Sequence, residues 1–419
     1  MKRLALNLLA WLAKLVAEKY QVKIVAITGS VGKTTVKEAI FAVLKQAYDV
    51  QRSLYNANTE WGIAASVIAP GFEPVFTADG KAKIGLGQYC QLVWQAKMKL
   101  LFRQKYPQVL VLELAADRPN DIRWFNKWFK YDIAVITLIG STHLEFYKDQ
   151  AELTAEKLAL ADAVKQQGLV VINGECDQCQ TFVAKPNQRR TTFGWNEHND
   201  YWAELVSENR YRLHHHEQVM EVGLPVGRQF VPAALMAWAV GQEFALNSEQ
   251  IQSGLSQLQP VAGRFQIEKT DQWTIIDDTY NAAPESTQMA LMSLQDIAAT
   301  DGQSSAEPRR RRVAILGEMR ELGDKKISQH HQIGELVATK VDLLIAMGEG
   351  GALIADGAGA AGMDANKILK INWRGGPEEV EPAIRQILPI LLDGDTVLVK
   401  ASRTIYLDRL VRELVKHRC

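Results

Sequence analysis

Lys33 and Thr34 are the residues whose types and spacing most directly suggest chemistry, because they lie in the stretch TGSVGKTT (28–35). The apolar run Val22 to Ile27 predicts a strand, and apolar residues at helical spacing after Lys33 predict a helix. A strand, a glycine-containing turn and a helix leave free backbone N–H groups at the helix start, where they can bind phosphate oxygens. Lys33 can then reach the β- and γ-phosphates of a nucleotide, and the Thr34 hydroxyl can ligate Mg²⁺. We therefore predict a nucleotide-phosphate site in the loop and the first helical turn (Gly29, Ser30, Val31, Gly32, Lys33, Thr34 and Thr35).

This loop departs from the strict Walker A sequence, G-x-x-x-x-G-K-[ST], which needs a glycine where Ile27 stands. The alternative is an ordinary strand–helix turn that contains GKT by chance. The combination of strand, turn and helix disfavours that alternative. The departure indicates a loop of the form TGxxGKTT, in which Ile27 ends the strand.

Length and composition indicate a globular protein of two or three domains, since 419 residues are more than one domain with a single hydrophobic core usually contains. Hydrophobic residues make up 47% and charged residues 23%, which excludes a disordered chain. Lys and Arg together number 48, as do Asp and Glu together, so the formal net charge is zero. The overall charge therefore does not indicate nucleic acid or an anionic membrane as a partner. Four cysteines in so long a chain make no disulfide framework and indicate the reducing cytoplasm.

The first twenty residues have a basic start and an apolar run, as signal peptides do. Lys14 and Glu18 interrupt the run, there is no convincing cleavage site, and the segment is too short and too charged to span a bilayer. A leucine stripe at helical spacing predicts an amphipathic helix over 1–20 (Leu4, Leu8, Leu12 and Leu15). The helix can pack on the next domain. Alternatively, it can bind a membrane surface or a partner protein.

Apolar, β-branched runs alternate with helical patterns along the rest of the chain, which predicts parallel sheets covered on both faces. Short alternating runs over 200–224 predict a small antiparallel element, and a helical segment follows at 230–258. The turn residues of 260–265 precede a second series of strands and helices, with an exposed loop at 300–312. We therefore predict an α/β protein with a P-loop central domain at 21–259, whose sheet is mostly parallel, and a Rossmann-like C-terminal α/β domain at 260–419.

The loop TGSVGKTT resembles the ATP loop of the Mur ligases, the ATP-dependent amide-bond-forming enzymes of peptidoglycan synthesis. Related folylpolyglutamate synthetases carry a similar loop. Further stretches are similar to Mur ligase motifs and follow in the family's order: NANTEWG (56–62), VLELA (111–115), ITLIGSTHLEFY (136–147) and TAEKLAL (154–160).

In the second domain the resemblance narrows to the branch that adds D-alanyl-D-alanine. The matching stretches are AGRFQ, IIDDTYNAAPEST (275–287), AILGEMRELG (314–323) and VLVKASR (397–403). The resemblance extends over residues 22 to 415. It implies that the γ-phosphate of ATP is transferred to a carboxylate, and that an amine then attacks the acyl phosphate.

The resemblance also implies roles for individual residues. Glu113 would hold Mg²⁺ together with Thr34, and His143 would bind a second Mg²⁺. Lys157 would be carbamylated, which converts a cation into an anionic metal ligand. Without the resemblance, Lys157 is an ordinary solvated lysine and His143 a core or capping histidine.

From the second domain, the resemblance implies that Arg264 reaches the phosphates and that Asn281 contacts the nucleotide. Asp278 and Tyr280 are further candidates near the nucleotide. Three residues after a buried-looking strand are candidates for the acceptor side of the cleft (Lys400, Ser402 and Arg403). Because two domains supply one phosphate site, we expect them to close on the substrate.

The largest departure from the family lies before the ATP loop. Mur ligases carry a UDP-sugar-binding domain of roughly 80 to 100 residues, a common domain size, where this sequence has only about 20 residues. Smaller departures are Gln229, Pro232, Ala283 and Ala401.

We therefore expect a cytoplasmic ATP- and Mg²⁺-dependent ligase that adds D-alanyl-D-alanine to a muropeptide tripeptide. The alternative is a Mur-like ligase for a lipid-linked or partner-presented carboxylate, in which a protein partner or membrane surface replaces the N-terminal domain. A P-loop switch or scaffold is a third hypothesis, which the complete set of site residues disfavours.

Three other patterns are interpreted as structural. The motif CDQC (176–179) has no second cysteine pair, which disfavours zinc or redox chemistry. The run HHH (214–216) is expected to be exposed, and RRRR (309–312) is expected to form a solvated loop, with an anionic partner as the alternative.

Overall fold

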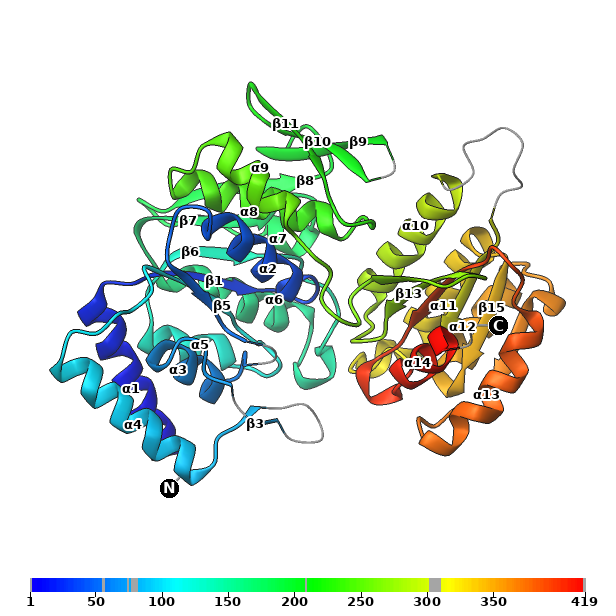
Figure 1. The fold of residues 1–419 in the computed structure, drawn as a ribbon, viewed down its shortest axis with the longest axis horizontal. Coiled ribbons are helices and arrows are strands. Elements are labelled where there is room, and N and C mark those ends of the chain that lie inside the picture. Colours follow the sequence, from blue (N-terminus) through cyan, green and yellow to red (C-terminus); the bar gives the residue numbers. More distant parts are fainter. Residues whose placement is uncertain are drawn as a thin grey trace.

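Two β-sheets organise the chain in a computed structural model that describes residues 2–54, 57–73, 75–76, 82–207, 209–300 and 310–416. Each sheet is flanked by helices, and the two units lie side by side, the first blue to green and the second yellow to red (Figure 1). The predicted α/β class, with a mostly parallel first sheet and a second α/β unit, is confirmed.

The first sheet has nine strands in the order β11-β10-β9-β8-β7-β6-β1-β5-β2. Its central strands, β1 (Lys23–Thr28), β5 (Val109–Glu113) and β6 (Tyr131–Ile136), are parallel and almost wholly buried, as their β-branched residues predict. The predicted antiparallel element over 200–224 is confirmed, because β9, β10 and β11 form an antiparallel meander. The remaining strands of this sheet are β2 (Val50–Arg52), β7 (Val164–Asn173), β8 (Arg189–Gly194), β9 (Tyr201–Ser207), β10 (Arg210–His215) and β11 (Gln218–Gly223). A separate two-stranded sheet pairs β3 (Val75–Phe76) with β4 (Ala82–Lys83).

The predicted strand–turn–helix unit is present, with β1 followed by α2 (Lys33–Leu44). The buried face of α2, which includes Val36, Ile40 and Val43, packs against α8 (Phe230–Glu243) and α9 (Ser248–Ser256). The predicted helical segment over 230–258 consists of two helices. The second begins at 248 because the Asn247 side chain caps it by accepting from the Gln250 N–H at 2.9 Å.

The N-terminal helix α1 (Lys2–Tyr20) packs against α3 (Glu60–Ile68) and α4 (Leu86–Leu101). Its buried face includes Leu9, Leu12 and Val16, whereas Leu4 and Leu8 of the predicted stripe are exposed. Of the leucines in the predicted stripe, Leu12 is therefore buried and Leu4 and Leu8 are exposed, because two neighbouring helices far along the chain determine which face of α1 is covered. Among the described residues, no helix is both long and apolar enough to cross a bilayer.

The second sheet has six strands in the order β12-β13-β17-β14-β15-β16, and only the pair β12–β13 is antiparallel. These strands are β12 (Gln266–Lys269), β13 (Thr274–Asp278), β14 (Arg312–Leu316), β15 (Leu343–Met347), β16 (Ile368–Ile371) and β17 (Thr396–Lys400). The accompanying helices are α10 (Pro284–Thr300), α11 (Lys326–Lys340), α12 (Gly348–Ala360), α13 (Val380–Ile387) and α14 (Asp408–Lys416). We propose residue 260 as the domain boundary, because it lies between α9 and β12.

Two surface expectations were wrong in part. Arg311 and Arg312 are not a solvated loop, because they pair with Asp395 at 2.7 Å and Asp342 at 3.0 Å. Arg309 lies outside the described residues, as do 301–308 of the predicted loop. In the histidine run, His216 is exposed as expected, but His214 and His215 are half-buried, and the His214 ring stacks on Trp202 with centroids 3.8 Å apart.

The packing of α1 gives a stability prediction. Leu9→Ala should lower the free energy of unfolding by about 2–5 kcal/mol, because it opens a cavity in a fully buried site. The matched control Leu4→Ala, on the exposed side of the same helix, should change it by about 0.5 kcal/mol or less. The midpoint of urea unfolding followed by circular dichroism measures both. Equal midpoints for the two variants would contradict the packing of α1 on the first unit.

Candidate active site

The glycine-containing loop opens onto a cavity of about 240 Å³ between the two units. From the first unit, the cavity is lined by the loop and the start of α2 (residues 30–35) and by Asn58, Glu113, Asp117, His143 and Gln229. The second unit adds Arg264, Asp278, Tyr280, Asn281 and Lys400. The structure therefore brings most of the predicted site residues to one cavity.

Two glycines and contacts with the segment after β6 fix the shape of this loop. Gly29 has φ +146°, and a Cβ there would lie 2.0 Å from the Thr137 Oγ1 atom, so only glycine fits. The Ser30 N–H donates to the Leu138 carbonyl at 2.6 Å, which fixes the loop to the segment after β6. Gly32, with φ +86°, precedes α2, and no side chain caps the helix. The open helix start is suited to a phosphate group.

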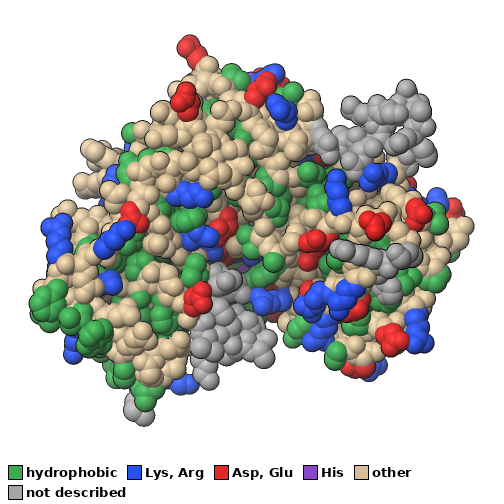
Figure 2. All heavy atoms as spheres, in the orientation of Figure 1, with side chains coloured by type: hydrophobic (Ala, Val, Ile, Leu, Met, Phe, Trp, Pro, Cys, Tyr) green, Lys and Arg blue, Asp and Glu red, His purple; other side chains and the backbone are tan. Residues whose placement is uncertain are grey.

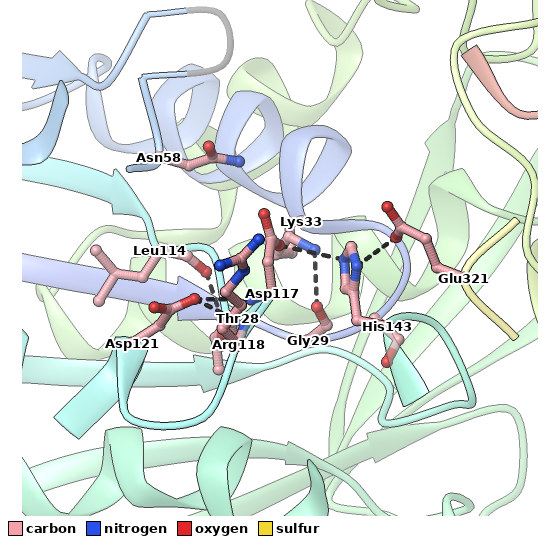
Figure 3. A network of polar contacts seen from close by, with 12 residues as sticks. Thr28, Gly29, Lys33, Asn58, Leu114, Asp117, Arg118, Asp121, His143 and Glu321 are labelled. Atoms are coloured by element: carbon pink, nitrogen blue, oxygen red, sulfur yellow. Dashed lines mark hydrogen bonds and ion pairs between the residues drawn. The ribbon is translucent and has the colours of Figure 1, made fainter. Parts of the chain in front are cut away.

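Lys33 lies over the loop, and its ammonium donates to the Gly29 carbonyl at 2.7 Å (Figure 3). Burial lowers the pKa of Lys33, while the carboxylates of Glu113 and Asp117 act in the opposite direction. A phosphate in the cavity would give this cation a stronger partner than a carbonyl.

Glu113 is the last residue of β5 and forms a buried polar cluster with α2. The Thr34 hydroxyl donates to its Oε2 at 3.0 Å, the Lys37 ammonium lies 3.3 Å from the same oxygen, and the Asn58 amide donates to Oε1 at 3.3 Å. Burial raises the pKa of Glu113, but the neighbouring cations, Lys37 first, lower it below its ordinary value overall. An ionised carboxylate beside a hydroxyl fits Mg²⁺, which takes hard oxygen ligands and keeps several waters. Within the described ranges, no three His, Cys, Asp or Glu side chains converge as a preformed metal cage.

His143 lies at the other side of the loop and joins the two units. Its Nε2 is 3.2 Å from Asp117 Oδ1, and its Nδ1 pairs with Glu321 of the second unit (Figure 3). The residue has φ +70° and precedes a 3-10 turn (Leu144–Phe146) without capping it. The alternative role as a capping histidine is therefore wrong.

Lys157, in α6 (Gln150–Leu158), is completely buried behind the loop. Among the described residues, its ammonium has hydrogen bonds only to the carbonyls of Gly29 at 3.5 Å and Ala116 at 3.4 Å. Burial and then the charge of Lys33 lower the pKa of Lys157 to about 7. The residue is not the solvated lysine that its sequence context alone suggested. Of the four predicted metal ligands, Thr34 and Glu113 touch each other, whereas His143 and Lys157 are bonded to other groups.

The second unit contributes a cation and a buried ion pair. The Arg264 guanidinium stacks on the Tyr280 ring, 3.9 Å from its centroid, and its charge lowers the pKa of both Glu113 and Lys33. Lys400 donates to Asp278 at 2.6 Å and to the Asn281 carbonyl at 2.9 Å. This ammonium therefore fixes the turn after β13, which carries Tyr280 and Asn281 to the cavity.

A second cavity, of about 590 Å³, adjoins the first and shares Asn58, Asp117, His143, Tyr280 and Asn281 with it. Its other walls carry both acidic and basic side chains, namely Glu318, Arg320, Glu321, Lys326 and Arg403. Ser402 also lines it, so two of the three residues predicted for the acceptor side lie here, and Lys400 lines the first cavity instead.

Sequence reasoning missed Lys37, Asp117, Glu285 and Glu321. Glu285 is a contact between the units, because its carboxylate accepts from the Ser141 N–H at 3.0 Å. Helical spacing could have identified Lys37, which is one turn after Lys33 on the same helix face. No local signal identifies Asp117 or Glu321, because the partner of each lies on a distant segment.

Two family models match the chain: the Mur ligase middle domain over residues 27–241, and the Mur ligase glutamate ligase domain over residues 263–403. The UDP-N-acetylmuramoyl-tripeptide–D-alanyl-D-alanine ligase of Bacillus subtilis is 26% identical over 416 residues, which cover 98% of this chain and 80% of that protein. The ligase of the same name from Mycobacterium tuberculosis is 30% identical and is covered over 72% of its length, with 94% of this chain.

Solved structures share the fold. MurF from Acinetobacter baumannii superposes with a TM-score of 0.77 at 24% identity, covering 97% of this chain and 80% of that one. MurF ligase from Thermotoga maritima in complex with ADP superposes with a TM-score of 0.75 at 24% identity. The match covers 98% of this chain and 83% of that one. A Mycobacterium tuberculosis folylpolyglutamate synthase superposes with a TM-score of 0.64 at 15% identity. The match covers 99% of this chain and 96% of that one.

The loop geometry gives a binding prediction. Lys33→Ala should weaken binding of ADP by about tenfold to a hundredfold, because a charge-assisted bond to phosphate is lost. Lys45→Ala, just beyond the far end of α2, is the matched control and should bind as the parent does. Isothermal titration calorimetry measures both. Unchanged affinity in Lys33→Ala would show that the nucleotide does not use this loop.

Proposed function

Since the chain belongs to the Mur ligase family, we propose that this ATP-dependent ligase adds D-alanyl-D-alanine to a muramoyl-tripeptide in peptidoglycan precursor synthesis. The observation that carries the proposal is the cavity between the units, where an anion-binding loop, an ionised Glu113 and Arg264 meet. The curated relatives named for this reaction, which align over nearly the whole chain, support it.

The reaction must bring a carboxylate up to a triphosphate, and the repulsion between these anions is the main barrier to overcome. Lys33 and the start of α2 would hold the phosphates from the first unit, and Arg264 would approach them from the second. Thr34 and Glu113 would hold Mg²⁺, which supplies further positive charge when bound. Asn281, fixed by Lys400, would contact the nucleotide.

In the first step, an oxygen of the substrate carboxylate attacks the γ-phosphorus, and the bond to the β-phosphate bridging oxygen breaks, releasing ADP. In the second step, the acceptor amine attacks the acyl carbon, loses a proton, and phosphate leaves with the C–O bond electrons. The second cavity is our proposed acceptor site, because its walls offer cations for the dipeptide carboxylate and carboxylates for its ammonium. Arg320, Lys326 and Arg403 supply the cations, and Glu318 and Glu321 the carboxylates.

We also propose that Lys157 is carbamylated and that, with His143, it serves a second Mg²⁺. A neutral amine is the form that adds CO₂, giving a carbamate anion and one proton. Burial already disfavours the ammonium form, and the neighbouring Lys33 would stabilise an anion at this position. The buried ammonium has no carboxylate partner at hydrogen-bonding distance among the described residues, which also supports the modification.

An assay of phosphate release tests the proposed reaction. With ATP and Mg²⁺, release should require UDP-MurNAc-tripeptide and D-alanyl-D-alanine together, and mass spectrometry should find the pentapeptide product. Release that needs neither substrate would contradict the ligase reaction. Release only with a lipid-linked muropeptide in place of the UDP donor would assign the same chemistry to a different carboxylate.

The carbamate gives a pH prediction. At a fixed concentration of dissolved CO₂, the carbamate should become more populated as the pH rises from 6 to 8, because the pKa of Lys157 is lowered to about 7 and the amine is neutral above it. A carbamate signal from ¹³CO₂ in the NMR spectrum measures it. Lys157→Ala should lose both this signal and ligase activity, whereas Lys148→Ala, an exposed lysine, should keep both. Full activity in Lys157→Ala would refute the modification.

A further inference from the structure

Helices α1 and α4 lie side by side at the end of the first unit, away from the second unit (Figure 1). They run in the same direction, because the Tyr89 hydroxyl donates to the Ala5 carbonyl at 3.3 Å near their starts. Near their ends, the Lys19 ammonium donates to the Lys99 carbonyl at 2.9 Å. The two helices therefore form one corner of the molecule.

Both helices expose an apolar stripe at this corner, although their other faces are packed in the core. Seven of the fifteen large exposed hydrophobic side chains among the described residues belong to α1, to α4 or to the residue after α4: Leu4, Leu8, Trp11, Leu86, Trp94, Leu101 and Phe102. Leu4 is 75% exposed, Trp94 62% and Leu101 73%. Green hydrophobic side chains gather in Figure 2 over the region that α1 and α4 occupy in Figure 1. We call these seven residues the α1/α4 surface.

The same corner is strongly cationic in a chain without net charge. Residues 2–20 and 86–106 hold eight lysines and arginines and one carboxylate, Glu18. From adjoining segments, Glu60 pairs with Arg3 at 3.8 Å and Asp49 with Lys105 at 3.7 Å. In the part of the chain that the structure describes, no carboxylate lies within ion-pair distance of Lys2, Lys19, Lys97, Lys99 or Arg103.

We propose that the α1/α4 surface docks the enzyme on an anionic lipid bilayer. Trp, Leu and Phe side chains enter the boundary between headgroups and acyl chains, and lysines and arginines around them pair with anionic headgroups. Because the inner faces of α1 and α4 are packed on the protein, the helices lie on the membrane and do not cross it. A second copy of this chain is disfavoured, because a two-fold interface would place two cationic surfaces against each other.

This surface is separate from the reaction site. The candidate active site lies between the units, whereas α1 and α4 are at the far end of the first unit (Figure 1). Docking by this corner therefore leaves the cavity accessible, and the proposal does not depend on the identity of the substrates.

Co-sedimentation of the full chain with vesicles tests the proposal. The protein should pellet with vesicles of equal parts phosphatidylglycerol and phosphatidylcholine, remain in solution with phosphatidylcholine alone, and be released by high salt. The double variant Trp94→Ser/Leu101→Ser should bind at least about tenfold more weakly, because apolar area is lost. The double variant Lys97→Gln/Arg103→Gln should bind about fivefold more weakly for each cation removed.

Matched controls change the same kinds of residue elsewhere. Val183→Ser/Leu392→Ser removes two exposed apolar side chains, and Lys340→Gln/Lys367→Gln removes two cations, and both should bind vesicles as the parent does. Circular dichroism melting shows that each variant is folded. Equal pelleting with both vesicle types, no pelleting, or controls that lose as much as the test variants would each overturn the proposal. So would self-association in sedimentation velocity that the Trp94→Ser/Leu101→Ser change removes, since the surface would then bind a second copy.

Discussion

The parallel pairing of β1 with β5 and β6 is the constraint on which the site depends. Ile27 pairs with Glu113 in register, so the loop after β1 and the carboxylate at the end of β5 emerge at the same edge of the sheet. The Thr34 hydroxyl reaches Glu113 only because α2 starts at that edge. On the other side, the Leu138 carbonyl in the segment after β6 accepts a hydrogen bond from the Ser30 N–H, and the Thr137 side chain leaves no room for a Cβ at Gly29. A single strand order therefore brings the proposed anion-binding loop next to the side-chain oxygens of Glu113 and Thr34.

The second unit adds charged groups at this edge of the first sheet that the first unit does not supply. Arg264 adds a cation near Glu113, and Glu321 and Glu285 bond to His143 and Ser141 of the first unit. Each of these contacts joins charged or polar groups at the boundary of the two units. Closure of the two units on a substrate, as we expect, would have to rearrange these polar contacts.

Much of the fold could be predicted from the sequence, because its signals are local. The β-branched runs and the glycines around Lys33 gave the strands, the loop and α2. The rest depends on contacts between distant segments. The buried face of α1 is set by α3 and α4, so Leu4 and Leu8 are exposed, and Arg312 is paired because β14 lies next to Asp342. Carboxylates such as Glu321, and the burial of Lys157, were not predictable from spacing for the same reason.

The carbonyl of Gly29 accepts hydrogen bonds from two ammonium groups, those of Lys33 and Lys157. Two cations that share one oxygen atom cannot change charge independently, so whatever alters the charge of Lys157 also alters how strongly Lys33 attracts phosphate. Thermodynamic linkage makes such an effect reciprocal, so a nucleotide bound at this loop would shift the proton equilibrium of Lys157 by the same free energy. With Lys157 carbamylated as we propose, the loop would couple the concentration of dissolved carbon dioxide to nucleotide affinity through a single backbone carbonyl.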